Sequence, residues 1–160
     1  MSVPTQNATI KSEKELIEEL QQIFDKFNHT EAFGRVAANL KVTQASVSSI
    51  TVEFVLCQQH VNSKQTLHGG LTAALTDIVT SRAVGAATDD LPRASLDLSV
   101  SYMMPAKLGE TVTIEAICLK IGRSVAFTEA IFRRKSDNVM IAKGTHNMSL
   151  MHHLRKPVSQ

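Results

Sequence analysis

The sequence is poor in aromatic residues. Phe and Tyr together make up 4% of its 160 residues, and there is no tryptophan. Hydrophobic residues still reach 43% and charged residues 20%, a composition that is typical of a folded domain and excludes global disorder. We therefore expect one domain, with a core built mainly from Val, Ile, Leu, Ala and Met.

Cysteines are also few. Cys57 and Cys118 each lie in a stretch that reads as a strand, and two cysteines without a secretory signal do not suggest a disulfide framework. The segment MSVPTQNATIKSEKE lacks the apolar region of a signal peptide and has no arginine, which argues against a mitochondrial presequence. We expect a reducing, cytoplasmic location, with the mitochondrion as the alternative.

Long apolar runs and a large net charge are both absent. No run reaches the roughly 20 residues that span a bilayer, and a net charge of +2 is too small to indicate nucleic-acid binding. The basic run Arg133-Arg134-Lys135 reads as a solvated strand end. The histidines show no zinc-type spacing. We therefore expect no membrane span, no nucleic-acid partner and no metal site.

The first element that the sequence predicts is an amphipathic helix. Ser12 is a candidate N-cap, and Glu15 follows it at capping-box spacing. Apolar residues then recur at helical spacing up to about residue 27: Leu16, Ile17, Leu20, Ile23, Phe24 and Phe27. We expect this helix to pack against a single domain that spans residues 12–150, with flexible tails over 1–11 and 151–160.

The remaining chain reads as strands around one internal helix. Alternating segments predict strands over 33–43 and 46–58, and then a helix over 69–86. Four further strands follow over 94–103, 111–121, 124–134 and 139–151. Strict alternation in the first of these four predicts Leu96, Leu98, Val100 and Tyr102 on one face and the serines with Asp97 on the other. This order predicts an α+β fold, with a mostly antiparallel sheet packed on the central helix.

The central helix contains the segment HGGLTAALTD, which ends in an acid. The residues in line with Asp77 are small (Gly70, Ala73 and Ala74), so we expect another element to approach this face closely. Burying a lone carboxylate is costly unless it is paired. Asp77 is therefore either a structural carboxylate, which caps a loop or pairs with Arg82, or a catalytic base or nucleophile.

His68-Gly69-Gly70 lies at the other end of this segment. A helix N-terminus offers free N–H groups and a positive dipole end that can polarise a carbonyl. Eight residues separate Gly69 from Asp77, which is about 12 Å along a helix. One small carbonyl cannot contact both in one chain. If both act on one substrate, two helices must lie antiparallel in a symmetric dimer, with each site shared between subunits.

With these residues in view, the sequence resembles the hot-dog-fold acyl-CoA thioesterases, of the thioesterase superfamily member 2 (acyl-CoA thioesterase 13) type, which are related to the phenylacetate-pathway enzymes. The resemblance covers roughly residues 33–150, and it rests on HVNSKQTLHGGLTAALTDIVTS, ASLDLSVSYMMPAKLGETVTIEA and GRSVAFTEA. It implies a long antiparallel sheet wrapped around a central helix. It also implies a dimer with a continuous sheet, a pairing of such dimers into a tetramer, and a place in fatty acid metabolism.

The resemblance also implies roles for five residues around a thioester of medium- or long-chain or aryl acyl-CoA. The Gly69 amide and the Asn62 side chain would polarise the carbonyl. His68 would position the substrate near the leaving thiolate. Asp77 of the facing subunit would activate the attacking water, which Ser95 would help to hold.

A second group of residues matches the stretches that grip coenzyme A in this family. They are Tyr102, Lys120, Ile121, Gly122, Arg123, Ser124 and Val125, with His146 near the nucleotide. Coenzyme A is part of the substrate, so no separate cofactor is implied.

One position departs from the family pattern. Gln65 stands where many relatives have a glycine, in the loop between Asn62 and His68. If the backbone there requires a positive φ, Gln65 must be strained or the loop must differ.

Two other functions stay open at this point. Hot-dog hydratases and dehydratases act on acyl thioesters, typically with a closely set Asp/His pair, whereas His68 and Asp77 lie two helical turns apart. The third reading is a non-catalytic module that binds acyl-CoA or a partner.

Overall fold

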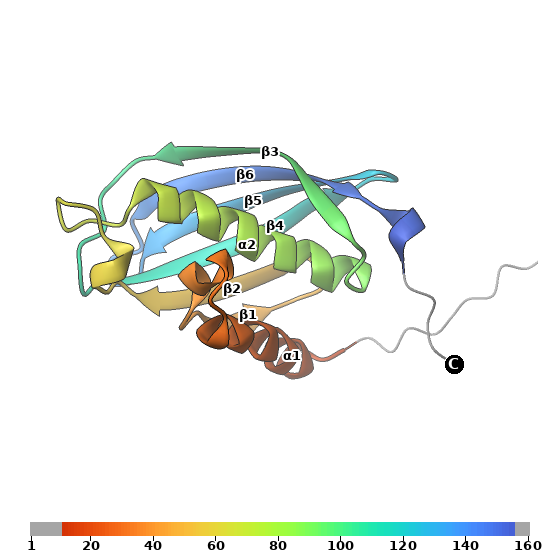
Figure 1. Cartoon of the computed structure of the whole chain (residues 1–160), viewed down its shortest axis with the longest axis horizontal. Helices are drawn as coiled ribbons and strands as arrows, with labels where there is room; N and C mark the ends of the chain where they lie inside the picture. Colours follow the sequence, from red (N-terminus) through yellow and green to blue (C-terminus); the bar gives the residue numbers. More distant parts are fainter. Residues whose placement is uncertain (1–10, 156–160) are drawn as a thin grey trace, which may run out of the picture.

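The computed structural model describes residues 11–155 of the chain, which form a curved sheet with two helices (Figure 1). The helices are α1 (Glu13–Asp25) and α2 (Gly69–Thr88). The strands are β1 (Lys41–Ala45), β2 (Ser49–Val55), β3 (Arg93–Tyr102), β4 (Thr111–Ile121), β5 (Val125–Arg134) and β6 (Met140–Leu150).

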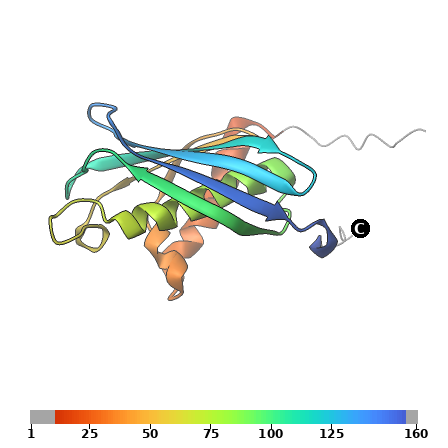
Figure 2. The ribbon, with the colours of Figure 1, turned by 90° about the horizontal axis from the view of Figure 1, so that it is seen from above.

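The six strands form one sheet in the order β1-β2-β4-β5-β6-β3. Every neighbouring pair is antiparallel, and α2 lies across one face of the sheet, which curves around it (Figures 1 and 2). The prediction of an α+β fold, with an antiparallel sheet wrapped around a central helix, is confirmed.

The core lies between α2 and the sheet. Leu75 and Val79 of α2 are fully buried, as are Ile114 and Phe132 of the sheet. This burial supplies most of the stabilisation at about 25 cal/mol per Å² of apolar surface. Helix α2 lies close to β6 at Gly144, where an added Cβ would lie 2.5 Å from Cγ2 of a buried threonine, Thr76.

Helix α1 begins as the sequence predicts. Ser12 and Glu15 form the capping box, and Leu16, Leu20 and Phe24 are buried. The helix also closes one edge of the sheet through Gln21. The Gln21 side chain accepts the Val42 N–H at 2.7 Å and donates to the Leu40 carbonyl at 3.1 Å.

The strand predicted from residue 33 is wrong in its first half. Phe33–Ala37 form a 3-10 helix, and β1 begins only at Lys41. Asn39 lies between them with φ 64°, and its N–H donates to Oδ1 of Asn28 at 2.7 Å. This tertiary contact holds a left-handed residue where the alternation alone indicated extended chain.

The chain after β6 continues in contact with the domain, where the sequence predicted a flexible tail. His152–Leu154 form a 3-10 turn, and Nε2 of His152 lies 2.9 Å from the Arg123 carbonyl. Arg155 pairs with Asp89 at 3.2 Å. The predicted tails over 1–10 and 156–160 lie outside the described residues.

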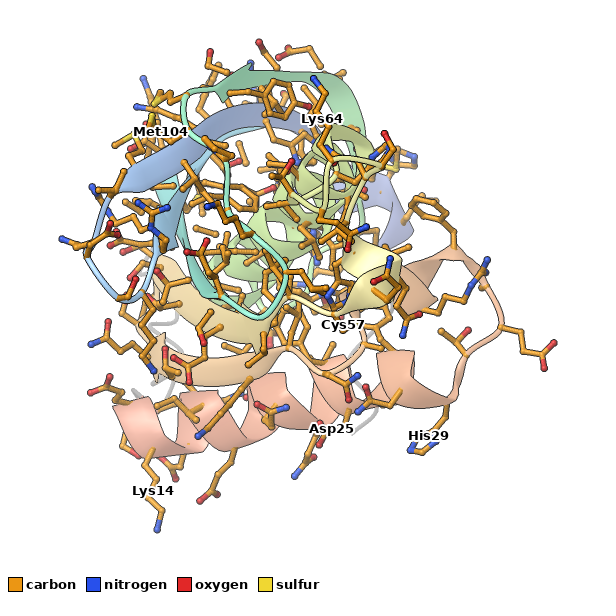
Figure 3. All side chains as sticks on the ribbon, turned by 90° about the vertical axis from the view of Figure 1, so that its left-hand side faces the viewer. Lys14, Asp25, His29, Cys57, Lys64 and Met104 are labelled. Atoms are coloured by element: carbon orange, nitrogen blue, oxygen red, sulfur yellow. The ribbon has the colours of Figure 1, made fainter. Side chains whose placement is uncertain are left out.

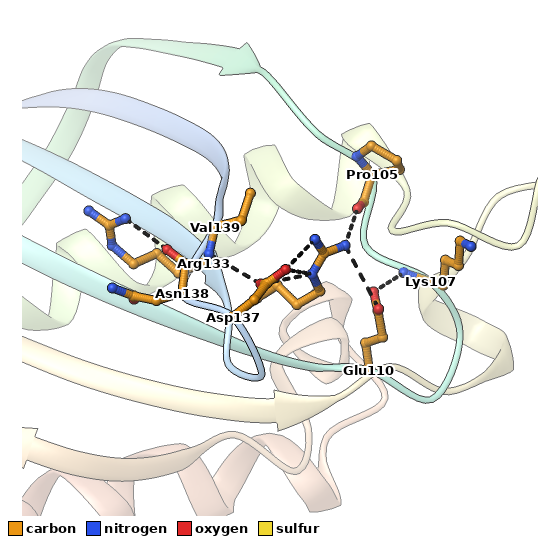
Figure 4. A network of polar contacts seen from close by, with 8 residues as sticks. Pro105, Lys107, Glu110, Arg133, Asp137, Asn138 and Val139 are labelled. Atoms are coloured by element: carbon orange, nitrogen blue, oxygen red, sulfur yellow. Dashed lines mark hydrogen bonds and ion pairs between the residues drawn. The ribbon is translucent and has the colours of Figure 1, made fainter.

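The basic run at the end of β5 is used within the fold. Arg134 grips Asp137 of the β5–β6 turn, with Nη2 to Oδ2 at 2.6 Å (Figure 4). This contact raises the pKa of Arg134 and lowers that of Asp137. Arg133 donates to the Asn138 carbonyl, and Lys135 pairs with Glu53. The run therefore fixes a turn and is not a free cationic surface.

Within residues 11–155, no helix combines the length and the apolarity that a bilayer crossing requires.

Candidate active site

Asp77 lies in the middle of α2 on the flank that faces β3. Its side chain is 50% exposed, and its Oδ1 accepts a hydrogen bond from the Ser95 hydroxyl at 3.1 Å. The ion pair with Arg82 that the sequence left open is not formed, because the Arg82 guanidinium turns to Asp90 at 4.0 Å. One carboxylate oxygen of Asp77 is thus held from β3.

Ser95 reaches Asp77 because β3 contains a bulge. Ser95 pairs with Met148 and Asp97 with Asn147, so β3 advances two residues while β6 advances one. The bulged residue, Leu96, breaks the strict alternation predicted for this strand. Ser95 therefore faces α2 together with Leu98, and the prediction that the two lie on opposite faces is wrong.

His146 completes this cluster from β6. It is fully buried, its Nε2 lies 3.4 Å from Oδ1 of Asp77, and its Nδ1 lies 2.7 Å from the Thr80 hydroxyl. Burial lowers the pKa of His146 below its usual range, although the charges of Asp77 and Asp97 oppose this. The structure places His146 behind Asp77, inside the fold, and not on a surface that a nucleotide would contact.

The hydrogen positions in this cluster follow from the partners. Nε2 of His146 is buried without a hydrogen-bond acceptor at normal distance among the described residues, and Asp77 is the nearest anion. Without a proton, the lone pair of Nε2 would face the negative carboxylate of Asp77 and repel it. A proton on Nε2 replaces this repulsion with an attraction. The Thr80 hydroxyl lies 2.7 Å from the Thr76 carbonyl, to which it can donate, and 2.7 Å from Nδ1 of His146. It has one proton for these two acceptors, and a proton on Nε2 leaves Nδ1 as an acceptor for it. We therefore assign an N–H directed from His146 toward Asp77.

A second cluster surrounds the N-terminus of α2. Nδ1 of His68 accepts the Gly70 N–H at 2.9 Å. The Gly69 N–H makes no hydrogen bond within the described chain. The Tyr102 hydroxyl donates to the Gly69 carbonyl at 2.9 Å, and its ring would lie 3.3 Å from a Cβ at position 69. Gly69 thus presents an unused donor beside an aromatic ring.

Asn62 organises the loop that precedes this helix. Its Oδ1 accepts the Lys64 N–H at 2.9 Å, and its Nδ2 donates to the Thr66 hydroxyl at 3.0 Å. The second hydrogen on Nδ2 remains for a ligand. Gln65 has φ 59°, so the loop adopts the left-handed conformation despite the missing glycine. Figure 3 views this end of the molecule, with Cys57 and Lys64 on the loop.

The two clusters lie apart in one chain. Gly69 and Asp77 are separated by about 12 Å along α2. Tyr102 and Ser95 occupy opposite ends of β3, pairing with Ala142 and Met148 of β6. At about 3.3 Å per residue that is roughly 20 Å. The cluster around Gly69 and the cluster around Asp77, which we call the two half-sites, therefore cannot meet within one chain.

The remaining residues predicted for coenzyme A lie on the β4–β5 hairpin. Lys120, Ile121, Arg123 and Ser124 are exposed there, with Gly122 and Val125 half-buried. The Leu150 N–H donates to the Ser124 carbonyl, which places the hairpin beside the end of β6. It lies at the Asp77 end of the sheet, away from Tyr102, so one chain does not gather these residues into one surface.

Sequence reasoning missed Thr80 and the position of His146. The inward alternation of Ala142, Gly144, His146 and Met148 in β6 was the available signal, because it puts His146 on the face that packs against α2. Thr80 lies three residues after Asp77, which puts both on neighbouring rows of the helix.

Comparison with known proteins identifies the family. The model of the thioesterase superfamily matches residues 64–141. Human acyl-coenzyme A thioesterase 13 is 33% identical over 84% of this chain and 96% of its own length. The chain belongs to the thioesterase superfamily.

Other members of the superfamily extend this result. A Caenorhabditis elegans protein whose name describes a candidate esterase is 45% identical over 86% of this chain and 82% of its own length. The crystal structure of zebrafish thioesterase superfamily member 2 is 33% identical, covers 84% of this chain and 98% of that one, and superposes with a TM-score of 0.82. The hot-dog fold implied by the sequence is confirmed.

Proposed function

We propose that this protein is an acyl-CoA thioesterase, which hydrolyses medium- or long-chain or aryl acyl-CoA to the free acid and coenzyme A. Membership of the thioesterase superfamily supports this, as do relatives named acyl-coenzyme A thioesterase 13. The observation that carries the proposal is the Asp77 carboxylate, one oxygen of which accepts the Ser95 hydroxyl and lies 3.4 Å from Nε2 of His146 while the side chain stays half exposed.

The chemistry requires a base, a water and a polarised carbonyl. Asp77 takes a proton from water as the oxygen attacks the thioester carbon. The Gly69 N–H and the Nδ2–H of Asn62 stabilise the oxyanion that forms. The carbon–sulfur bond then breaks, and the coenzyme A thiolate leaves near His68. Thioesters are activated acyl donors, so we assign no metal or separate cofactor to the reaction.

Both half-sites are completed in a homodimer. Asp77 of one subunit would lie beside Gly69 and Asn62 of the other if two α2 helices cross antiparallel at the small residues between them. Strand β3 ends the sheet, and its Leu96 and Tyr102 are 57% and 58% exposed. Pairing of β3 with its symmetry mate makes the sheet continuous and covers this apolar edge.

His146 acts through Asp77 in this proposal and does not contact the substrate. Its N–H would fix which carboxylate oxygen of Asp77 faces the water. Thr80 holds the imidazole in the tautomer that this requires. Both are positioning residues, and removing either should lower kcat while KM stays nearly unchanged.

The pairing of Asp77 with His146 also bears on the hydratase alternative. A hydratase needs a histidine that reaches the substrate, whereas His146 is fully buried behind the carboxylate. Incubation with an enoyl-CoA separates the two functions. Loss of the conjugated-enone absorbance without release of thiol would establish a hydratase and contradict the thioesterase proposal.

The direct test is release of free thiol from a series of acyl-CoA substrates of increasing chain length, run beside a measurement of native mass. Asp77→Asn should lower kcat by about 10²–10⁴-fold, because it removes the general base, and should leave the oligomer intact. Asp97→Asn is the matched control, since Asp97 lies on the outer face of β3 against Asn147. Normal turnover in Asp77→Asn would refute the role of Asp77.

A further inference from the structure

A groove lies between α1 and the C-terminal half of α2, away from the β3 flank that carries Asp77. Its volume is about 590 Å³, within the range of small-molecule sites. Leu16, Leu20 and Ile23 of α1 line it, as does Val47 of the β1–β2 turn. Figure 1 shows α1 running beside this half of α2.

Three cations and three acids line the groove, and Arg93, which is outside the lining, adds a fourth cation beside one of the acids. Lys11 pairs with Glu19 at one side, and Arg155 pairs with Asp89 at 3.2 Å at another. Each of these four charges has its own partner, so neither pair leaves an excess of either sign.

Asp90, the third acid of the groove, is shared by two arginines. Arg93 holds Oδ1 of Asp90 at 3.1 Å and also donates to the Ser81 hydroxyl and the Leu91 carbonyl. Arg82 approaches the same oxygen only to 4.0 Å. Among the charges of the groove and Arg93, four cations thus face three acids, and Arg82 makes the longest contact of the four.

Arg82 is poorly solvated where it lies. Its side chain is 28% exposed, and its Nε is buried with no hydrogen-bond partner within residues 11–155. Burial, helped by the neighbouring Arg93, lowers the pKa of the guanidinium below its usual range. A buried, unpartnered donor on a cation costs free energy that an incoming anion would recover.

We propose that this groove binds one free aliphatic carboxylate per chain, with the carboxylate on Arg82 and the tail along Leu16, Leu20, Ile23 and Val47. A groove with an apolar wall and one weakly paired cation fits the two ends of such a molecule. The site is separate from Asp77. The acid released by the proposed thioesterase reaction belongs to the same chemical class, so the groove is a place where product accumulates on the enzyme.

The experiment is calorimetric titration of the full-length protein with decanoate. We expect one site per chain, and a dissociation constant that Arg82→Met raises roughly 10- to 100-fold, because a charged hydrogen bond is lost. Decan-1-ol, which lacks the anion, should bind the wild type as weakly as decanoate binds Arg82→Met. Arg35→Met is the matched control and should leave decanoate binding unchanged, since Arg35 caps carbonyls elsewhere.

A second variant keeps the test decisive if Arg82→Met fails to fold. Val47 is 56% exposed, so Val47→Glu is tolerated by the fold and places an anion at the mouth of the groove. It should also weaken decanoate binding. An affinity unchanged by Arg82→Met or by Val47→Glu would overturn the proposal. Binding is measured without hydrolysis, and Asp77→Asn should retain it, so this result does not depend on whether the thioesterase proposal holds.

Discussion

Gln65 holds a backbone conformation that favours glycine, with φ 59°, and this makes a prediction at the scale of one residue. A non-glycine residue in the left-handed region costs about 1–2 kcal/mol, partly offset by the larger entropy that glycine loses on folding. Gln65→Gly should therefore raise the free energy of unfolding by about 0.5–1 kcal/mol. Chemical denaturation of the wild type and the variant measures this change in the free energy of unfolding.

Gln22, on the exposed face of α1, is the matched control for this substitution. A glycine in a helix interior costs about 1 kcal/mol, so Gln22→Gly should lower stability while Gln65→Gly raises it. A loss of stability in both variants would show that the loop does not depend on the sign of φ at residue 65.

Two buried histidines predict how stability depends on pH. Burial lowers the pKa of His60 and of His146 in the folded state, whereas both regain a pKa of about 6.5 on unfolding. Below pH 6.5 the unfolded chain therefore binds more protons, and the stability present above that pH is lost as pH falls toward the folded values. Urea midpoints at pH 7.5 and 5.5 should show this loss.

His146→Gln provides the comparison for the pH dependence. The glutamine keeps a polar group of similar length but cannot titrate, so the difference between the two midpoints should shrink relative to wild type. An equal pH dependence in His146→Gln would mean that His146 does not contribute.

At the scale of elements, Gly144 sets how closely α2 lies on β6. A methyl group there would lie 2.5 Å from Cγ2 and 2.7 Å from Oγ1 of Thr76, whose side chain is buried and cannot move aside. Gly144→Ala should cost about 1–3 kcal/mol through overpacking. Thermal unfolding of Gly144→Ala, Thr76→Ala and the double variant tests the mechanism. The cost of Gly144→Ala should fall in the Thr76→Ala background, and purely additive effects would contradict the clash.

The elements differ in how far local sequence determines them. The strand over 111–121 was predicted with its observed bounds, because its alternation and flanking turns agree with its place in the sheet. The structure of residues 33–40 was not predicted correctly, because it depends on the contact between Asn39 and Asn28, which are 11 residues apart in the chain. The face of Ser95 depends on pairing with β6 through a bulge, and no alternation within β3 reveals that pairing.

At the scale of the whole molecule, the spacing of Gly69 and Asp77 was enough to predict two separated half-sites. His146 was identified as a site residue but was assigned to the nucleotide, because its burial depends on how α2 lies on β6. His146 and Asp77 are 69 positions apart in the chain. The periodicity within α2 or within β6 therefore cannot predict that they lie side by side.

Shared sites predict rescue between inactive chains. Asp77→Asn and Asn62→Ala should each be nearly inactive alone. Co-expressed with different tags and purified as the hybrid dimer, they should form one intact and one doubly altered site, with about half of wild-type turnover. Sites built within one chain would leave the hybrid as inactive as its parents.

The two edges of the sheet differ in one further respect. Strand β1 is short and has a register irregularity between Val42 and Gln44. The Gln21 side chain hydrogen-bonds the Val42 N–H and the Leu40 carbonyl along this edge. Strand β3 is twice as long and ends the sheet with its edge uncovered among the described residues. If β3 pairs with its symmetry mate as proposed, growth by edge pairing stops after one addition, because the doubled sheet presents only a blocked β1 at both ends. In that dimer, Gln21 would limit the molecule to closed assemblies and protect it from forming fibres.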